Sequence, residues 1–327
     1  MKLALKIRNY LNLKAITILF YSIIFICIFS CGNSVKENYE IGLENIRNQD
    51  YEAAIGSFSE IIAKDTTVYE VYQSRSFCYY STKEYKKAIK GYEKAYLLNS
   101  NPQLNFNIGI CKVNIGDFKG ALENFNAFER KNSEDKNLWL QKALCLNELK
   151  QYPMAIEYYE KAKIAFPDSI KILKNLGLCH FQLSQYYGVI EVLEPYLDTI
   201  KNDQTCFEMI AFSCHELGQY ENSKKYFDQM SVLGMEWGEN PQLLYVDNLL
   251  QIGQKQYNTK KFIAALQTFS EIITLDPVNK EAFFFRGLVQ LHYEKRKEAC
   301  EDFNLAFKNG HSKAISVMKK NCKEYFD

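Results

Sequence analysis

The chain has 327 residues, with 23 tyrosines, 22 phenylalanines and only 6 prolines, and its formal net charge is +1. Acidic and basic residues nearly balance, whereas nucleic-acid binding requires a basic surface. The chain contains no GxxxxGK phosphate loop, no GxSxG nucleophile turn and no HExxH zinc motif, and its four histidines are scattered. We therefore expect no nucleic-acid partner, no catalytic residues, no metal site and no cofactor.

The first thirty residues have the layout of an export signal. Four basic residues and no acid precede an apolar run from Ala15 to Phe29, which is followed by Ser30, Cys31 and Gly32. A basic start, an apolar core of about 7–15 residues and a small residue at the cut are typical of secretory signals. A membrane-spanning helix usually needs about 20 apolar residues, so this run is short.

The segment Ile28-Phe29-Ser30-Cys31 resembles the lipobox of bacterial lipoproteins, in which the cysteine is acylated and the preceding peptide is removed. The resemblance implies a signal peptide over residues 1–30, lipidation at Cys31 and a short lipidated tether over residues 31–36. It also implies membrane attachment through this lipid, and Gly32 favours the outer membrane. The alternative is an uncleaved anchor helix. Both interpretations place the remaining chain outside the cytoplasm.

The rest of the chain repeats one pattern of two amphipathic helical segments. A small residue in the first segment recurs at Gly42, Ser76, Gly109, Ala143, Gly177, Ala211, Gly253 and Gly287. A small residue in the second recurs at Ala54, Ala88, Ala121, Ala155, Val189, Ser223, Ala265 and Ala299. Four positions later stands a large apolar residue: Phe58, Tyr92, Phe125, Tyr159, Leu193, Phe227, Phe269 or Phe303. The gaps are 33 or 34 residues, with a single gap of 42. Helical amphipathicity alone has a period of 3.6 residues, so this spacing indicates repeated units.

This pattern resembles the tetratricopeptide (TPR) repeat, which has a period of about 34 residues. The resemblance implies an all-α fold, a right-handed α-solenoid of about eight helical hairpins with a C-terminal capping helix. Repeats one to six are expected over residues 37–231, repeats seven and eight over 246–310, and the capping helix over 311–327. Asp50 and Asp117 precede second helices, where a carboxylate can cap free backbone amides.

The gap of 42 places eight extra residues within 232–245, a segment that contains Gly234, Gly238 and Pro241. Glycine and proline are typical of turns, so we predict an inter-repeat loop or hinge there. Two interpretations stay open, a surface loop and a break that separates two sub-arrays. Trp237, in the same segment, is the one aromatic residue that has no place in the expected core.

Four of the ten cysteines share one repeat position, two residues after the small residue of the first helix: Cys78, Cys111, Cys145 and Cys179. Equivalent neighbouring helices lie about 8–10 Å apart. A disulfide needs Cα atoms within about 7 Å. We therefore predict that most thiols stay free and act as small apolar core residues.

In TPR arrays the first helices line a concave face that binds partners, so the resemblance implies protein partners held in a groove. The expected partner-binding residues are Tyr39, Leu43, Gln73, Phe77, Tyr80, Phe106, Asn107, Ile110, Leu140, Leu144, Asn147, Lys174 and Phe181. The same face continues through Ile46, Leu178, Phe212 and His215. An alternative is that these side chains pack against the next repeat.

Only Lys171 and Lys174 approximate the basic set with which some TPR domains hold a peptide carboxylate, so that mode is disfavoured. An apolar groove suits a helix or an extended apolar segment instead. We expect a non-enzymatic adaptor or scaffold in the cell envelope. The alternative is a sugar- or peptide-binding component of an outer-membrane uptake system, which the presence of only two tryptophans weakens. The sequence indicates no oligomeric state.

Overall fold

The computed structural model describes residues 35–198, 200, 203–236 and 238–323, and the described chain is helical without strands. The predicted signal peptide, the lipidation site Cys31 and Trp237 lie outside these residues. The chain divides after Gln151 into two compact units, a first unit up to that residue and a second unit from Tyr152 onward. None of the described helices is both long and apolar enough to cross a membrane.

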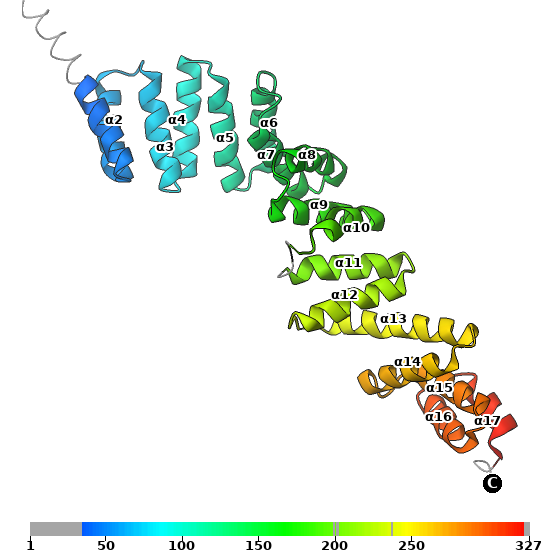
Figure 1. Cartoon of the computed structure of the whole chain (residues 1–327). Helices are drawn as coiled ribbons and strands as arrows, with labels where there is room; N and C mark the ends of the chain where they lie inside the picture. The colour runs from blue at the N-terminus through cyan, green and yellow to red at the C-terminus, as the bar shows by residue number, and fades with distance from the viewer. Residues whose placement is uncertain (1–34, 199, 201–202, 237, 324–327) are drawn as a thin grey trace, which may run out of the picture. The chain divides into compact units, whose positions relative to one another are not determined.

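The first unit consists of antiparallel helical hairpins (Figure 1). Its described helices are a helix over residues 35–47, α2 (Tyr51–Lys64), α3 (Tyr69–Ser81), α4 (Tyr85–Leu98), α5 (Pro102–Asn114), α6 (Phe118–Glu129) and α7 (Lys136–Glu148).

The second unit continues the pattern and ends in a short additional helix. Its described helices are α8 (Tyr152–Ala165), α9 (Ile170–Gln182), α10 (Tyr186–Leu193), the 3-10 turn η1 (Glu194–Tyr196), α11 (Gln204–Glu216), α12 (Tyr220–Val232), α13 (Glu239–Asn258), α14 (Phe262–Leu275), α15 (Lys280–His292), α16 (Arg296–Lys308) and α17 (Ala314–Asn321).

Contacts between small and large residues explain the repeat period. A Cβ atom placed on Gly109 would lie 2.5 Å from the ring of Phe125, and one on Gly253 would lie 2.7 Å from the ring of Phe269. The first helix of each of these hairpins therefore needs a residue without a side chain where the large ring of the second helix crosses it. These contacts confirm the predicted fold class of TPR-type hairpins.

Two predicted helix caps are present in the first unit. The Asp50 carboxylate accepts a hydrogen bond from the Ala53 amide at 3.0 Å, and Asp117 accepts one from the Gly120 amide at 2.9 Å. Each bond satisfies a backbone donor that the first turn of a helix leaves without an internal partner. α2 and α6 therefore begin where the sequence places them.

The predicted loop over residues 232–245 is wrong in its second half. α13 begins at Glu239 and has 20 residues, whereas the first helices α3, α5 and α7 have 13 each. Pro241 lies in the first turn of α13, where a missing N–H removes no internal hydrogen bond. Most of the inserted residues therefore lengthen a helix.

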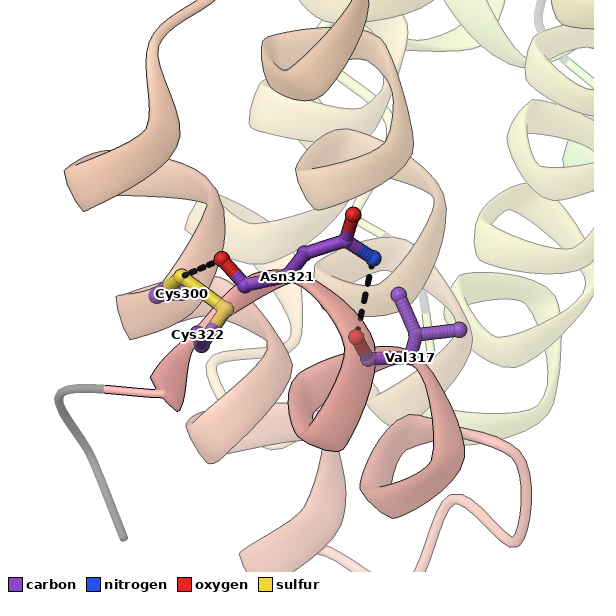
Figure 2. The surroundings of a disulfide bond; sticks show 4 residues. All are labelled: Cys300, Val317, Asn321 and Cys322. Carbon is purple, nitrogen blue, oxygen red and sulfur yellow. Dashed lines mark hydrogen bonds between the residues drawn. A yellow bond between two sulfur atoms is a disulfide. The ribbon is translucent and has the colours of Figure 1, made fainter. Parts of the chain in front are cut away.

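The capping helix α17 covers the end of the last hairpin. Its Ala314 and Met318 are buried against an apolar cluster that includes Phe284 and Phe303. A disulfide joins Cys300 of α16 to Cys322 just beyond α17, with Cα atoms 5.7 Å apart (Figure 2). The bond was not predicted from the sequence, because the distance between equivalent helices of neighbouring repeats does not apply to α17, which is not a repeat helix. The other six described cysteines are buried and lie outside this disulfide.

Candidate functional site

A groove of about 690 Å³ lies in the second unit between α9, α11 and α13. We call it the α9–α11–α13 groove. Its apolar lining comprises Leu178, Phe181, Met209, Phe212, Phe227, Pro241, Leu243 and Leu244. Its polar lining comprises Gln182, Thr205, Glu208, Asn240 and Asp247. Ligand sites in proteins typically enclose about 300–1,000 Å³ and combine an apolar lining with a few polar groups, so this groove has the size of a binding site.

Helical spacing brings the lining residues of each helix onto one face. On α11, Thr205, Glu208 and Phe212 are three and four residues apart, so they lie above one another. The ring of Phe212 also packs edge-on against that of Phe181 from α9, with centroids 5.2 Å apart. Two aromatic rings from different helices, packed edge to face, therefore form the floor of the groove.

The extended start of α13 supplies one wall of the groove. Asn240, Pro241, Leu243 and Leu244 all lie in the first two turns of this helix. Leu243 is 60% exposed although it is a large apolar residue. A helix of the usual length would not contain these side chains, so the insertion creates the wall.

A buried hydrogen-bond network connects the helices beside the groove. The Nδ1 atom of His215 donates to Oδ1 of Asn248 at 2.8 Å, and Nδ2 of Asn248 donates to the Ser223 hydroxyl at 2.8 Å. That hydroxyl donates to the carbonyl of Ala211 at 2.6 Å. Because Asn248 and Ser223 are fully buried, breaking the chain would leave polar groups without partners. The network therefore holds α11, α12 and α13 in one arrangement.

The charged lining of the groove is acidic. Glu208 accepts a hydrogen bond from the side chain of Gln204 at 2.7 Å, and Asp247 lies 3.5 Å from Nε2 of His215. Among the described residues that line the groove there is no lysine or arginine. An apolar floor beside two carboxylates suits a ligand that combines apolar side chains with a positive charge.

The expected partner-binding residues of the first unit are mostly half-buried and lie against second-helix rings. Tyr39 packs against Phe58 with centroids 5.7 Å apart, and Phe106 packs against Phe125 at 5.6 Å. Phe77 is 41% exposed and lies 6.2 Å from the ring of Tyr51. Half-buried positions are Tyr39, Leu43, Gln73, Tyr80, Phe106, Asn107, Ile110, Leu140, Leu144 and Asn147. Their role in partner binding stays a prediction.

In the second unit, the structure gathers Phe181, Leu178 and Phe212 at the groove. Lys174 instead forms an ion pair with Asp203 at 2.8 Å. The repeat pattern did not indicate Glu208 or Asp247 as site residues, and the predicted loop over residues 232–245 concealed the α13 wall. No group of three or more potential metal ligands occurs in the described part of the chain.

Comparisons with known proteins identify the repeats. Tetratricopeptide-repeat family models match residues 69–102 and 108–170, and the model of anaphase-promoting complex, cyclosome, subunit 3 matches residues 151–229. The BBSome complex member BBS4 of Bos taurus is 25% identical over 66% of this chain and 40% of its own length. A TPR repeat-containing protein of Methanocaldococcus jannaschii is 21% identical over 77% of this chain and 39% of its own length. The chain thus spans about two fifths of these relatives.

Among solved structures, the C-terminal part of a TPR repeat-containing protein from Cytophaga hutchinsonii is similar, with a TM-score of 0.51 and 18% identity. The similarity covers 76% of this chain and 98% of that one. A likeness at this identity supports the fold and carries no information on the ligand. The chain therefore contains tetratricopeptide repeats, and its described part is all-α.

Proposed function

We propose that the protein is a non-enzymatic adaptor of the cell envelope, which holds a segment of a partner protein in the α9–α11–α13 groove. The observation that carries the proposal is the groove itself, with an apolar floor, an acidic edge and a wall built by an insertion in α13. The relative BBS4 and the matching family of anaphase-promoting complex subunit 3 are, by their names, members of multi-protein complexes.

The chemistry of the groove defines the segment that it would hold. An apolar groove between helices typically receives an amphipathic helix through side chains at positions i, i+3 or i+4, and i+7. Burial of apolar surface would be the main favourable contribution to the free energy of binding. Glu208 and Asp247 favour a lysine or arginine at the edge of that helix. The proposed partner segment is therefore an apolar helix with at least one basic residue.

Crosslinking from defined positions tests the groove proposal. A photoreactive residue at Leu244 should capture discrete protein partners in cells, and one at Lys297, exposed on α16 outside the groove, should not. Phe212→Ala should weaken the captured interaction by about tenfold or more, because interface anchors typically contribute 2 kcal/mol or more. Identical adducts from both positions, or an unchanged affinity in Phe212→Ala, would contradict the proposal.

The envelope location rests on the resemblance of residues 28–31 to a lipobox. In this proposal Cys31 becomes the first residue of the mature protein, and several acyl chains give stable membrane attachment where one chain would not. Cys31→Ser should abolish metabolic labelling with a fatty acid and leave the precursor uncut. Cys27→Ser, which removes the neighbouring thiol, is the matched control and should be labelled normally. Persistent labelling of Cys31→Ser would exclude the lipoprotein.

A further inference from the structure

One position of the repeat carries a cation in three hairpins. Arg75, Lys142 and Arg286 each stand immediately before the small residue of their first helix. Arg286 donates two hydrogen bonds of 2.8 Å to the carboxylate of Asp302, which is 3% exposed. Lys142 forms an ion pair with Glu129 at 2.7 Å. In these two hairpins a carboxylate of the chain neutralises the cation, as a cation removed from water requires.

Arg75 has the same surroundings without the carboxylate. Its Nη1 atom donates to the hydroxyl of Ser59 at 3.0 Å, and Arg286 makes the equivalent contact with Ser270 at 3.4 Å. The repeat position that holds Asp302 beside Arg286 is occupied by Gly91 beside Arg75. Within the described chain Arg75 has no ion pair, and its guanidinium lies 5.8 Å from the ring centroids of Tyr72 and Tyr79.

The packing of Ser76 explains why no carboxylate stands beside Arg75. The Ser76 hydroxyl donates to the carbonyl of Tyr72 at 2.7 Å, and a Cβ atom at position 91 would lie 2.0 Å from its Oγ. Ser76 thus permits only glycine at position 91. In the last hairpin the equivalent of Ser76 is Gly287, which leaves room for the Asp302 side chain. At these two repeat positions the α3–α4 hairpin therefore has Ser76 and Gly91, whereas the last hairpin has Gly287 and Asp302.

Because no carboxylate stands at position 91, a basic recess lies between α3 and α4. It has a volume of about 230 Å³ and is lined by Tyr72, Arg75, Tyr79, Lys87, Lys90, Gly91 and Lys94, with no carboxylate in this lining. Lys87, Lys90 and Lys94 are three and four residues apart and project from one face of α4. Lys87 forms an ion pair with Glu84 and is also attracted by Glu52. Lys90 and Lys94 have no ion pair with any described residue.

We propose that this recess binds a phosphate group at the place where the Asp302 carboxylate lies in the last hairpin. The planar guanidinium of Arg75 can donate to two oxygens of one oxyanion, and the lysines add point charges around it. A single carboxylate would match only the arginine, whereas the additional charges of Lys90 and Lys94 favour a group with more than one negative charge. The phosphate could belong to a soluble compound or to a phospholipid headgroup, which present the same oxygens.

Binding measurements on the full chain test the site with two probes. Inorganic pyrophosphate, followed by calorimetry at physiological ionic strength, represents a soluble ligand. Phosphatidylcholine vesicles with and without phosphatidylglycerol, followed by co-sedimentation, represent a headgroup. The decisive variant is Ser76→Gly/Gly91→Asp, which transfers the internal carboxylate of the last hairpin into the recess. We expect it to weaken binding by at least about tenfold, because it places a negative charge where the ligand binds.

Two further variants keep the test decisive. Lys90→Ala/Lys94→Ala changes only exposed side chains, so it preserves the fold and should weaken binding several-fold even where the first variant is unstable. Lys86→Ala removes an exposed lysine of α4 outside the recess and should bind like the original chain. Pyrophosphate binding that is lost in the recess variants supports a soluble ligand, and variant-sensitive binding to the anionic vesicles alone supports a headgroup. Binding to neither probe, or equal binding by all variants, overturns the site.

Discussion

The first-helix faces of the two units differ although both units follow the same repeat register. In the first unit Phe106 packs against the second-helix rings of Phe125 and Phe128, with centroids 5.6 and 5.2 Å apart. In the second unit Phe181 and Phe212 pack against each other and form the floor of the α9–α11–α13 groove. First-helix rings therefore fill the hairpin in one unit and line a hollow in the other.

The length of a helix accounts for this difference. α13 has 20 residues, and its first two turns contribute Asn240, Pro241, Leu243 and Leu244 to the groove. The first helices of the first unit have 13 residues and have no such extension. The register of small and large residues thus sets how the hairpins pack, and an insertion that preserves this register sets where a groove can form.

Matched truncations of the large second-helix residue test this distinction. Phe125 is fully buried in the first unit, and Phe227 is 1% exposed below the groove in the second. Phe125→Ala should lower the free energy of unfolding by about 3–5 kcal/mol, the usual effect of removing a buried ring. Phe227→Ala should have an effect near the lower limit, because its cavity opens into the groove and can fill with water. Chemical denaturation measures both losses, and a loss below about 1 kcal/mol in Phe125→Ala would show that the repeat register is wrong.

The disulfide of the second unit predicts the next largest effect. The double substitution Cys300→Ser/Cys322→Ser should cost about 3 kcal/mol, since the bond closes a loop of roughly 20 residues that includes the capping helix. A reductant should lower the melting temperature of the original chain and leave that of the variant unchanged. An equal response of both proteins would argue against the bond.

The reactivity of the six cysteines outside the disulfide tests whether these residues are buried. Burial raises the pKa of Cys78 to about 11 and that of Cys145 to about 12. The reactive thiolate is therefore scarce at pH 8, and exclusion from solvent slows the reaction further. We expect the six buried thiols outside the disulfide to react with a thiol reagent mainly after denaturation. Rapid reaction of the folded protein would contradict the buried cysteine positions.

The hairpins were predictable from the sequence because each crossing has a strict steric requirement. Gly42 lies against Phe58 and Gly109 against Phe125 at distances that exclude any Cβ atom. The small and large residues at these crossings therefore reveal the repeat period in the sequence. The start of α13 at Glu239 was harder to predict from the sequence. Gly234, Gly238 and Pro241 are turn-forming residues, but proline in the first turn of a helix is tolerated, so the same residues fit a loop and a helix start.

Prediction of the groove was limited by information that a repeat pattern does not carry. Phe181 and Phe212 follow from their positions on first helices, whereas the acidic character of the lining depends on which carboxylates face one space. Glu208 and Asp247 come from α11 and α13, and their common location requires the geometry of three helices. The Cys300–Cys322 bond likewise depends on how α17 packs against α16, which breaks the repeat. Sequence periodicity therefore predicts equivalent contacts better than unique ones.

Helix capping offers a smaller and more local comparison between the units. In the first unit Asp117 caps α6 through the Gly120 amide, whereas at the equivalent position before α14 Lys261 makes no side-chain cap. Asp117→Ala should cost about 1 kcal/mol, a typical loss for a removed carboxylate cap. Lys261→Ala should leave stability within about 0.5 kcal/mol of the original, as surface substitutions usually do. Denaturant titration of both variants compares the two helix starts, and equal losses would contradict the assigned cap.

The smallest effect concerns the protonation of His311 at the cap of the second unit. Its ring stacks on Phe284 with centroids 4.0 Å apart, and burial lowers the pKa of His311 below its ordinary value. The unfolded chain therefore binds the proton more tightly than the folded chain. Stability should be fully present above the ordinary histidine pKa of about 6.5 and should decline as the pH falls toward the lower pKa of the folded state.

Melting temperatures between pH 7.5 and pH 5 measure this dependence. His311→Asn should reduce the slope, because asparagine does not titrate in this range, whereas His292→Asn removes a histidine of α15 and should leave the contribution of His311 intact. Since protonation acts at one end of the repeat array, the change should appear mainly in the hydrogen exchange of α16 and α17. An unaltered slope in His311→Asn would mean that the ring is hydrated and is not held against Phe284.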